Sequence, residues 1–154
     1  AIVRGHPPAS QLWDEPLVEK RDRIADKKAR LDKPAQPAVT KLVTLRSWTV
    51  PFSTGKYPTS RYSLINAMPL TGRKHQLRRH LNHMAHPIVG DTTYGDRRHN
   101  RLFRETFGVG RLLLMATRLK LVHPVTGDSI VIEAKEDAEF RIAIDELSKH
   151  DVNN

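Results

Sequence analysis

Apolar residues follow two different periods along the chain, and the β-type period comes first. β-prone residues run over 41–50 and again over 61–68, and a Ser-Thr-Gly turn at 53–55 lies between the two runs. We therefore expect these two strands to pair as an antiparallel hairpin. Two further apolar runs, over 111–122 and 129–134, flank a turn that contains Pro and Gly. They predict a second pair of strands.

Two segments carry the helical period instead. Within 71–86, apolar residues fall at i, i+4, i+7 and i+8, which is one face of a helix. We expect Thr71 to be its N-cap and His86-Pro87 to end it, because the residue before a proline is pushed out of the α region. Within 137–149, apolar residues at i, i+4 and i+7 predict a terminal helix that docks by one stripe.

The remaining segments read as irregular. Residues 6–40 are rich in proline and charge and predict an extended, loop-rich arm, in which only 22–30 has the composition for a helical turn or two. Residues 91–110 are polar and contain glycines and other turn formers, which predicts a long surface loop. The expected class is α+β, with a mostly antiparallel sheet and few helices. The length of 154 residues is typical of a single domain.

Charge divides the chain into unlike parts. The net charge is +9, and residues 72–123 hold eleven basic and three acidic residues, whereas 124–154 hold three basic and eight acidic residues. A concentrated positive field suits a polyanion such as nucleic acid, because each phosphate contact releases counterions. The alternative is a solvated basic face, and charge alone does not decide between them.

Absent residue types exclude several classes of function. The sequence has no cysteine, which excludes a disulfide scaffold, a thiolate nucleophile and a zinc finger and fits a reducing cytoplasm. No apolar run approaches the ~20 residues that a membrane-spanning helix needs. The first five residues, 1–5, look like the interior of a strand and show no signal-peptide pattern.

The densest group of cations opens the helix predicted over 71–86. A helix N-terminus offers backbone N–H groups and a positive dipole end, so anions bind there, whereas cations placed there cost stability. The alternative is a basic turn paired with acids elsewhere in the fold. The cationic side chains in question are Arg73, Lys74, Arg78 and Arg79, with His75 between them.

Four histidines, at 75, 80, 83 and 86, form a second cluster in the same region. Helical spacing can bring two of them to one face as metal ligands. Only Asp91 lies nearby to complete such a site, so we expect no metal and assign the imidazoles to hydrogen bonds within the fold or to phosphate. A histidine–metal hydrolase is the corresponding alternative.

A third group lies in the predicted loop over 91–110 and just after it. Arginines with an interleaved aromatic residue are typical of an arm that contacts nucleic acid and stacks on a base. A solvated surface loop is the equal alternative. The residues are Arg97, Arg98, Arg101, Arg104 and Arg111, with His99, Asn100 and Phe103 between them.

These motifs together resemble RluA-type pseudouridine synthases. The matching segments are Thr71-Gly72-Arg73-Lys74-His75-Gln76-Leu77-Arg78 with His80, His86-Pro87-Ile88-Val89-Gly90-Asp91, Tyr94-Gly95, Arg111-Leu112-Leu113-Leu114-Met115-Ala116 and His123-Pro124-Val125-Thr126-Gly127. The resemblance covers most of residues 1–135. The segment 95–101 is similar to the branch of the family that acts on the T arm of tRNA, at uridine sixty-five.

The resemblance implies an isomerase that uses no cofactor and no metal. Such enzymes detach uracil from uridine, turn it and rejoin it through carbon 5, with an aspartate nucleophile in a segment reading R-L-D-x-x-T-S-G. Here Arg30-Leu31-Asp32 is followed by Lys33-Pro34, and it lies after the strand-like segment 1–5 that the family's aspartate precedes. We therefore expect the nucleophile upstream of this chain, which corresponds to the carboxy-terminal part of the enzyme's catalytic domain and is inactive alone.

The resemblance also implies roles for residues of this chain. Arg78 would pair with the missing aspartate, and Leu77 would pack against the uracil of a uridine flipped out of its stack. The expected partners are tRNA and the missing amino-terminal part. The alternative is a basic RNA-binding module without catalysis. The expected RNA-binding residues are Arg73, Lys74, His75, Arg79, Arg97, Arg98 and Arg101.

Overall fold

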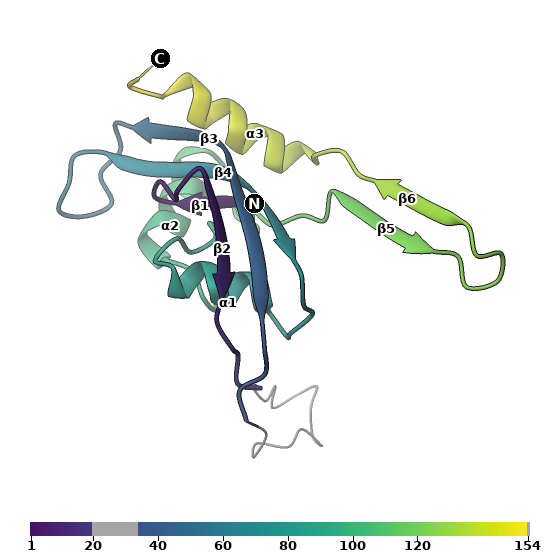
Figure 1. Cartoon of the computed structure of the whole chain (residues 1–154). Helices are drawn as coiled ribbons and strands as arrows, with labels where there is room; N and C mark the ends of the chain where they lie inside the picture. The colour runs from purple at the N-terminus through teal and green to yellow at the C-terminus, as the bar shows by residue number, and fades with distance from the viewer. Residues whose placement is uncertain (20–33, 154) are drawn as a thin grey trace.

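A long antiparallel hairpin forms the centre of the structure. The computed structural model describes residues 1–19 and 34–153. Strand β3 (Val39–Val50) pairs with β4 (Ser60–Pro69), so the predicted first hairpin is confirmed. The strand β1 (Ile2–Arg4) pairs with β4, and β2 (Ser10–Asp14) pairs with β3. The result is a four-stranded antiparallel sheet in the order β1-β4-β3-β2 (Figure 1).

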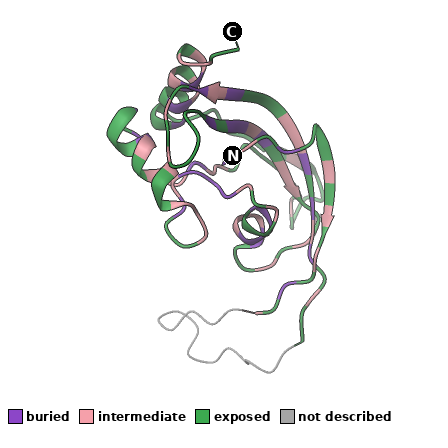
Figure 2. Ribbon diagram, turned by 90° about the vertical axis from the view of Figure 1, so that its left-hand side faces the viewer, coloured by how far each residue is buried: buried purple, intermediate pink, exposed green. Residues whose placement is uncertain are grey.

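The register of the hairpin places its large apolar side chains in one layer. Trp48 lies opposite Tyr62, and both are fully buried, as is Val50. A register shift between Thr44 and Arg46 interrupts the ladder in the middle. Figure 2 shows buried residues along β3 and β4, where the helices approach the sheet. The expected α+β class with a mostly antiparallel sheet is confirmed.

The prediction of an irregular arm over 6–40 is wrong for residues 10–14 and 39–40, which lie in strands, and the other described residues of this segment belong to no strand or helix. Residues 10–14 form the edge strand β2, and beyond it Leu17 and Gln36 exchange backbone hydrogen bonds. The prolines lie on either side of this strand and not within it. Every residue of the strand therefore keeps the backbone N–H that pairing with β3 can use. The predicted helical turn at 22–30 and the Asp32 motif lie outside the described residues.

The helix predicted over 71–86 is present but shorter. Helix α1 runs over Gln76–His83, and its N-cap is His75 in the left-handed region at φ 54°, not Thr71. The Thr71 hydroxyl instead donates to the Gln76 side chain at 2.8 Å and accepts from the Val39 N–H at 2.9 Å. These bonds tie the approach to the helix onto β3, and this long-range contact was not visible in the local sequence pattern.

The helix also ends earlier than its proline predicts. Met84 is the C-cap of α1, and Ala85 adopts a positive φ of 60°. The chain therefore leaves the helical path before His86-Pro87, and the His86 N–H donates to the Leu81 carbonyl across the turn.

The predicted surface loop over 91–110 is wrong for residues 97–106. Helix α2 occupies Arg97–Thr106, and its N-cap is Asp96, whose carboxylate accepts from the Arg98 N–H. Phe103 within the helix and Phe107 just beyond it are buried in the main core. A helix that is polar on most of its surface thus forms because two apolar residues at i and i+4 hold one face against the sheet.

The cap of α2 gives a first testable prediction. Asp96→Ala should lower the free energy of unfolding by about 1–2 kcal/mol, because the helix loses its side-chain N-cap and Arg4 loses the carboxylate with which it pairs at 2.6 Å. Urea denaturation of the chain measures this difference. Asp145→Ala is the matched control, since Asp145 is exposed on the last helix of the chain. If the two variants are equally stable, the cap makes no contribution.

The strand predicted over 111–122 is confirmed only in part. Regular pairing begins at β5 (Arg118–Val122), which pairs with β6 (Ser129–Glu133) as a separate two-stranded sheet. In the preceding stretch, Leu113 accepts from the Ile2 N–H and donates to the Val89 carbonyl, but no ladder forms. The β5–β6 hairpin extends away from the rest of the chain (Figure 1).

The predicted terminal helix over 137–149 is confirmed as α3 (Ala138–Lys149). Asp137 is its N-cap, and Phe140 and Leu147 are buried on its inner face. The helix lies along the end of β3, where the Trp48 indole N–H donates to the Ser148 hydroxyl at 3.2 Å. None of the helices in residues 1–19 and 34–153 has the length and apolar character to cross a membrane.

Candidate functional site

A bidentate ion pair joins α1 to the segment that follows it. Arg78 Nε donates to Asp91 Oδ2 at 2.7 Å, and Nη2 donates to Oδ1 at 2.8 Å. The carboxylate side chain is 1% exposed and the arginine side chain 19% exposed. A planar guanidinium that meets a carboxylate in this way is held in one orientation.

The backbone around Asp91 keeps its carboxylate ionised. Burial by itself raises the pKa of Asp91, but hydrogen bonds from Arg78 and from the N–H groups of Tyr94 and Thr93 outweigh burial and hold the pKa below its ordinary value. The bond to Asp91 likewise raises the pKa of Arg78. The pair is therefore charged throughout the neutral range.

Helix α2 fixes the position of this acid. The Asn100 side-chain amide donates to the Asp91 carbonyl at 2.8 Å, and its oxygen accepts from the Gly90 N–H at 2.8 Å. Gly90 has φ 80°, and a Cβ there would lie 1.8 Å from the Arg111 carbonyl oxygen, so only glycine fits. The site is thus supported from α1, α2 and the segment after Gly110.

Part of Arg78 remains available beyond the ion pair. Its Cζ lies 5.0 Å from the centre of the Tyr94 ring, and the Tyr94 hydroxyl is within 3.2 Å of His75 Nδ1. Within residues 1–19 and 34–153, the Nη1 group of Arg78 forms no hydrogen bond. The end of the guanidinium fork, formed by Nη1 and Nη2, can therefore receive a second anion.

The other cations predicted around α1 occupy unlike positions. Arg73 is half-buried and donates to the Pro37 carbonyl and the Gln36 side chain, at 3.0 and 2.7 Å. Lys74 and His75 are exposed. Arg79 is only 5% exposed, and its Nε has no hydrogen-bond partner among the described residues. The structure therefore brings Lys74 and His75 to the surface near Arg78, and it buries Arg79.

Leu77 is half-buried on α1, next to the arginine that binds Asp91. The neighbouring histidines have fold-supporting bonds. His80 is buried, with Nδ1 2.9 Å from the Thr40 hydroxyl and Nε2 3.0 Å from the Glu15 carbonyl, and burial lowers the pKa of His80. His83 pairs with the Glu15 carboxylate at 2.8 Å. In the described part of the chain no group of three or more potential ligands could hold a metal ion.

Helix α2 carries the second group of predicted cations on its outer face. Arg97, Arg98 and Arg101 are all exposed. Arg104 is exposed beside Glu105 at 3.5 Å, whereas Arg111 lies apart from the helix and pairs with Asp137. The predicted loop of arginines is therefore a helical face of four arginines, and Arg111 supports the start of α3.

Sequence reasoning missed the central role of Asp91 and Asn100. The sequence pattern places Asp91 at the end of a family-like segment and near four histidines, and Asn100 between arginines, without indicating the partners of either. The signal that was present is an acid directly after the apolar run Ile88-Val89 and a glycine, because a buried carboxylate at such a place requires a cation. Asn100 carried no such signal, since its partners lie nine and ten residues away.

Comparison with known proteins gives matches over most of the chain. A family model described as RNA pseudouridylate synthase matches residues 1–83. The chain is 51% identical over 144 residues to tRNA pseudouridine synthase C of Salmonella typhimurium, covering 94% of this chain and 55% of that protein. It is 51% identical over 147 residues to the protein of that name from Vibrio cholerae, covering 96% of this chain and 60% of that protein.

A solved structure gives the same assignment of fold. The chain is similar to human RNA pseudouridylate synthase domain containing 1, with a TM-score of 0.59 and 26% identity over 88% of this chain and 52% of that one. The chain thus spans a little over half the length of these relatives. The resemblance drawn from the motifs of the sequence is confirmed.

Proposed function

The chain belongs to the RNA pseudouridylate synthase family, and from this premise we propose that it provides the supporting half of an active site that isomerises uridine to pseudouridine in tRNA. The nucleophile is an aspartate that lies upstream of this sequence. Both relatives are named tRNA pseudouridine synthase C, which supports tRNA as the substrate class. The proposed position is the T arm, and the proposed location is the cytoplasm, where tRNA is modified.

The observation that carries the proposal is the unused edge of Arg78. Asp91 holds Nε and Nη2, which leaves the end of the fork, with Nη1, for another carboxylate. A second carboxylate seated there would be kept ionised by the nearby positive charge and held in one direction by two parallel hydrogen bonds. A carboxylate that serves as a nucleophile must be ionised and must be directed at the atom that it attacks.

Neighbouring side chains fit the other tasks of such a site. Leu77 is half-buried on the same helix and supplies an apolar contact for the uracil ring. Lys74 and His75 are exposed at the start of α1, where RNA phosphates would meet them together with Arg97, Arg98 and Arg101 of α2. We do not include Arg79 in this interface because it is buried. We place Arg73 at the inner edge of this RNA interface, because its guanidinium also donates to the Gln36 side chain and to the Pro37 carbonyl.

Tritium release tests the proposal. Isomerisation breaks the bond between ribose and uracil, forms a new carbon–carbon bond at carbon 5 and expels the hydrogen of carbon 5 to water. We expect no release from tRNA labelled at carbon 5 by this chain alone. We expect release when the chain is joined to the upstream segment of its Salmonella relative.

The control is the same joined protein with the upstream aspartate changed to asparagine, which should be inactive. Release by the chain alone would show that its own Asp32, in the segment outside the described residues, had been wrongly dismissed. Absence of release by a folded, tRNA-binding joined protein would instead support the alternative of a binding module without catalysis.

A further inference from the structure

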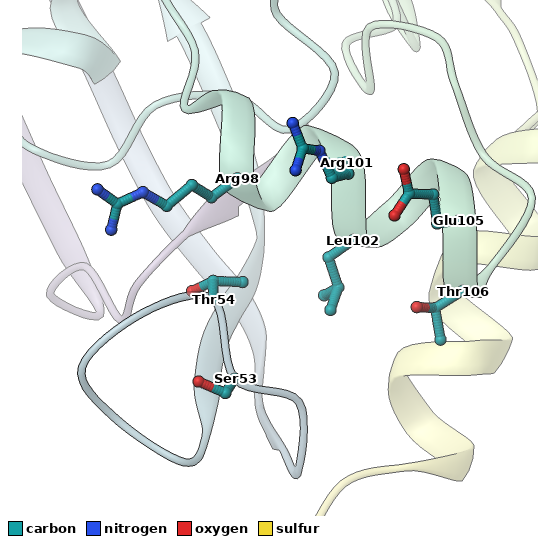
Figure 3. A pocket seen from close by; sticks show the side chains of 7 residues that line it. All are labelled: Ser53, Thr54, Arg98, Arg101, Leu102, Glu105 and Thr106. Atoms are coloured by element: carbon teal, nitrogen blue, oxygen red, sulfur yellow. The ribbon is translucent and has the colours of Figure 1, made fainter.

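A groove lies between α2 and the loop that joins β3 to β4. It encloses about 440 Å³. Figure 3 shows Leu102 pointing into the space between helix and loop, with Ser53 and Thr54 on the loop side and Thr106 on the helix side. We call this the α2 groove. Its lining residues are Ser53, Thr54, Arg98, Arg101, Leu102, Glu105 and Thr106.

The loop is fastened to the helix at one end of the groove. The Thr54 hydroxyl lies 3.1 Å from His99 Nε2 and 3.2 Å from the Ser60 hydroxyl. Gly55 lies against the Arg98 side chain, because a Cβ added there would be 3.0 Å from Nη1. His99 is itself bonded to the Tyr62 hydroxyl at 2.8 Å, so this wall is anchored in the core. The groove is therefore preformed by packing and does not depend on a free loop.

The charges at the groove are unbalanced. Arg98 and Arg101 are exposed, and within the described residues neither guanidinium has an ion pair or a hydrogen-bond acceptor. Glu105 is the only acid in the lining, and it pairs with Arg104 at 3.5 Å. Two uncompensated guanidinium groups beside a concave surface favour an anion that accepts planar, forked hydrogen bonds, such as a phosphate.

The remaining lining narrows the ligand further. Leu102 gives an apolar floor, and the hydroxyl of the exposed Thr106 can bond to a sugar or base atom. Ligand pockets of a few hundred Å³ hold molecules the size of a nucleotide. The bases of an RNA duplex are stacked and paired, so only an unpaired nucleotide can enter such a hollow.

We infer that the α2 groove binds one unpaired nucleotide of the RNA substrate, with its phosphate between Arg98 and Arg101 and its base against Leu102. This inference rests on the proposed function insofar as the ligand is RNA. It goes further by assigning a defined site, with the β3–β4 loop as one wall, to a nucleotide other than the isomerised uridine. A nucleotide fixed in this groove would set the register of the RNA on the protein, and therefore which uridine reaches Arg78.

The test is binding of RNA to the chain as it stands. Arg98→Ala/Arg101→Ala should weaken binding of tRNA about 10–100-fold at moderate salt, as expected from the loss of both guanidinium contacts to one phosphate. It should also reduce the slope of log K against log salt by about 0.7, the value for one phosphate of a single strand. The matched control is Arg118→Ala/Arg141→Ala, which removes the same charge from exposed positions on β5 and α3.

A second comparison separates a nucleotide site from a diffuse positive field. The unaltered chain should prefer an RNA stem–loop to a fully paired duplex of equal length, and the Arg98/Arg101 variant should lose that preference. Thermal melts check that each variant is folded. Equal binding by the groove variant and its control, or equal losses for stem–loop and duplex, would overturn the inference.

These outcomes are separate from those of the activity test. If the joined protein releases tritium while the groove variant binds like its control, the groove assignment fails and the proposed function stands. If the unaltered chain binds no RNA at all, the groove assignment fails together with the RNA-binding part of the proposal.

Discussion

Arg78→Ala in the joined, active protein should reduce turnover by about 10³-fold or more, the scale of losing a preorganised electrostatic contact in a water-poor site. The variant loses both functions of the guanidinium, which are to hold Asp91 on one edge and to receive the nucleophile's carboxylate on the other. Tritium release under single-turnover conditions measures the effect, because it reports chemistry and not product departure.

Binding and a conservative variant make this result interpretable. The Kd for tRNA should change by less than about 3-fold, since one half-buried arginine contributes little to a field set by exposed cations. Arg78→Lys keeps the charge but cannot form two parallel bonds to each carboxylate, so it should remain strongly impaired. Arg141→Ala, an exposed change on α3, should be fully active. Unimpaired turnover in Arg78→Ala would remove this residue from the mechanism.

Asp91→Ala should lower the free energy of unfolding of the chain by about 3–5 kcal/mol, as does removal of one partner from a buried ion pair. It leaves the Arg78 guanidinium and the N–H groups of Thr93 and Tyr94 without their acceptor. Urea denaturation gives the value. Asp145→Ala, exposed on α3, should change stability by no more than about 0.5 kcal/mol. A similarly small loss for Asp91→Ala would mean that the pair does not support the fold.

The same carboxylate gives the fold a dependence on pH. The folded pKa of Asp91 lies below its ordinary value, so the unfolded chain takes up the proton first as the pH falls. The stability from this group is therefore complete above about pH 4, the ordinary value for aspartate, and is lost as the pH falls through the folded pKa. Asp91→Asn, which cannot titrate, should unfold with a flatter pH profile below pH ~4 than the parent chain.

Local pattern predicted the parts of the fold that local residues determine. The β3–β4 hairpin and α3 follow from periodicity, because each has a regular apolar face and a clear turn or cap. Strand β2 and helix α2 were missed, since β2 is a short segment among prolines that depends on β3 for pairing. Helix α2 is mostly arginine and polar residues, and it depends on burial of Phe103 and Phe107.

The sequence likewise predicted some residues of the candidate site and not others. The motif around Arg78 identified the family and placed the arginine correctly on a helix. The partner of Arg78 among the described residues, Asp91, lies thirteen residues away, and the Asn100 bridge comes from the helix that the sequence did not predict. The charge pattern of the sequence does not distinguish Arg79 from the neighbouring cations, although the geometry of the helix turns this side chain inward and buries it. Spacing alone does not separate arginines that point outward from those that support the core.

The order of strands in the sheet bears on how the chain folds. Strands β1 and β2 are separated by five residues, yet they occupy opposite edges of the sheet, and each pairs only with one strand of the β3–β4 hairpin. The partners of β2 are residues 39–43 of β3, and the partners of β1 are residues 62–64 of β4. Strand β2 therefore has no partner strand until residue 43 has been synthesised, and β1 has none until residue 64 has been synthesised. Folding of this sheet is accordingly limited by long-range contacts, and its central hairpin is the natural nucleus.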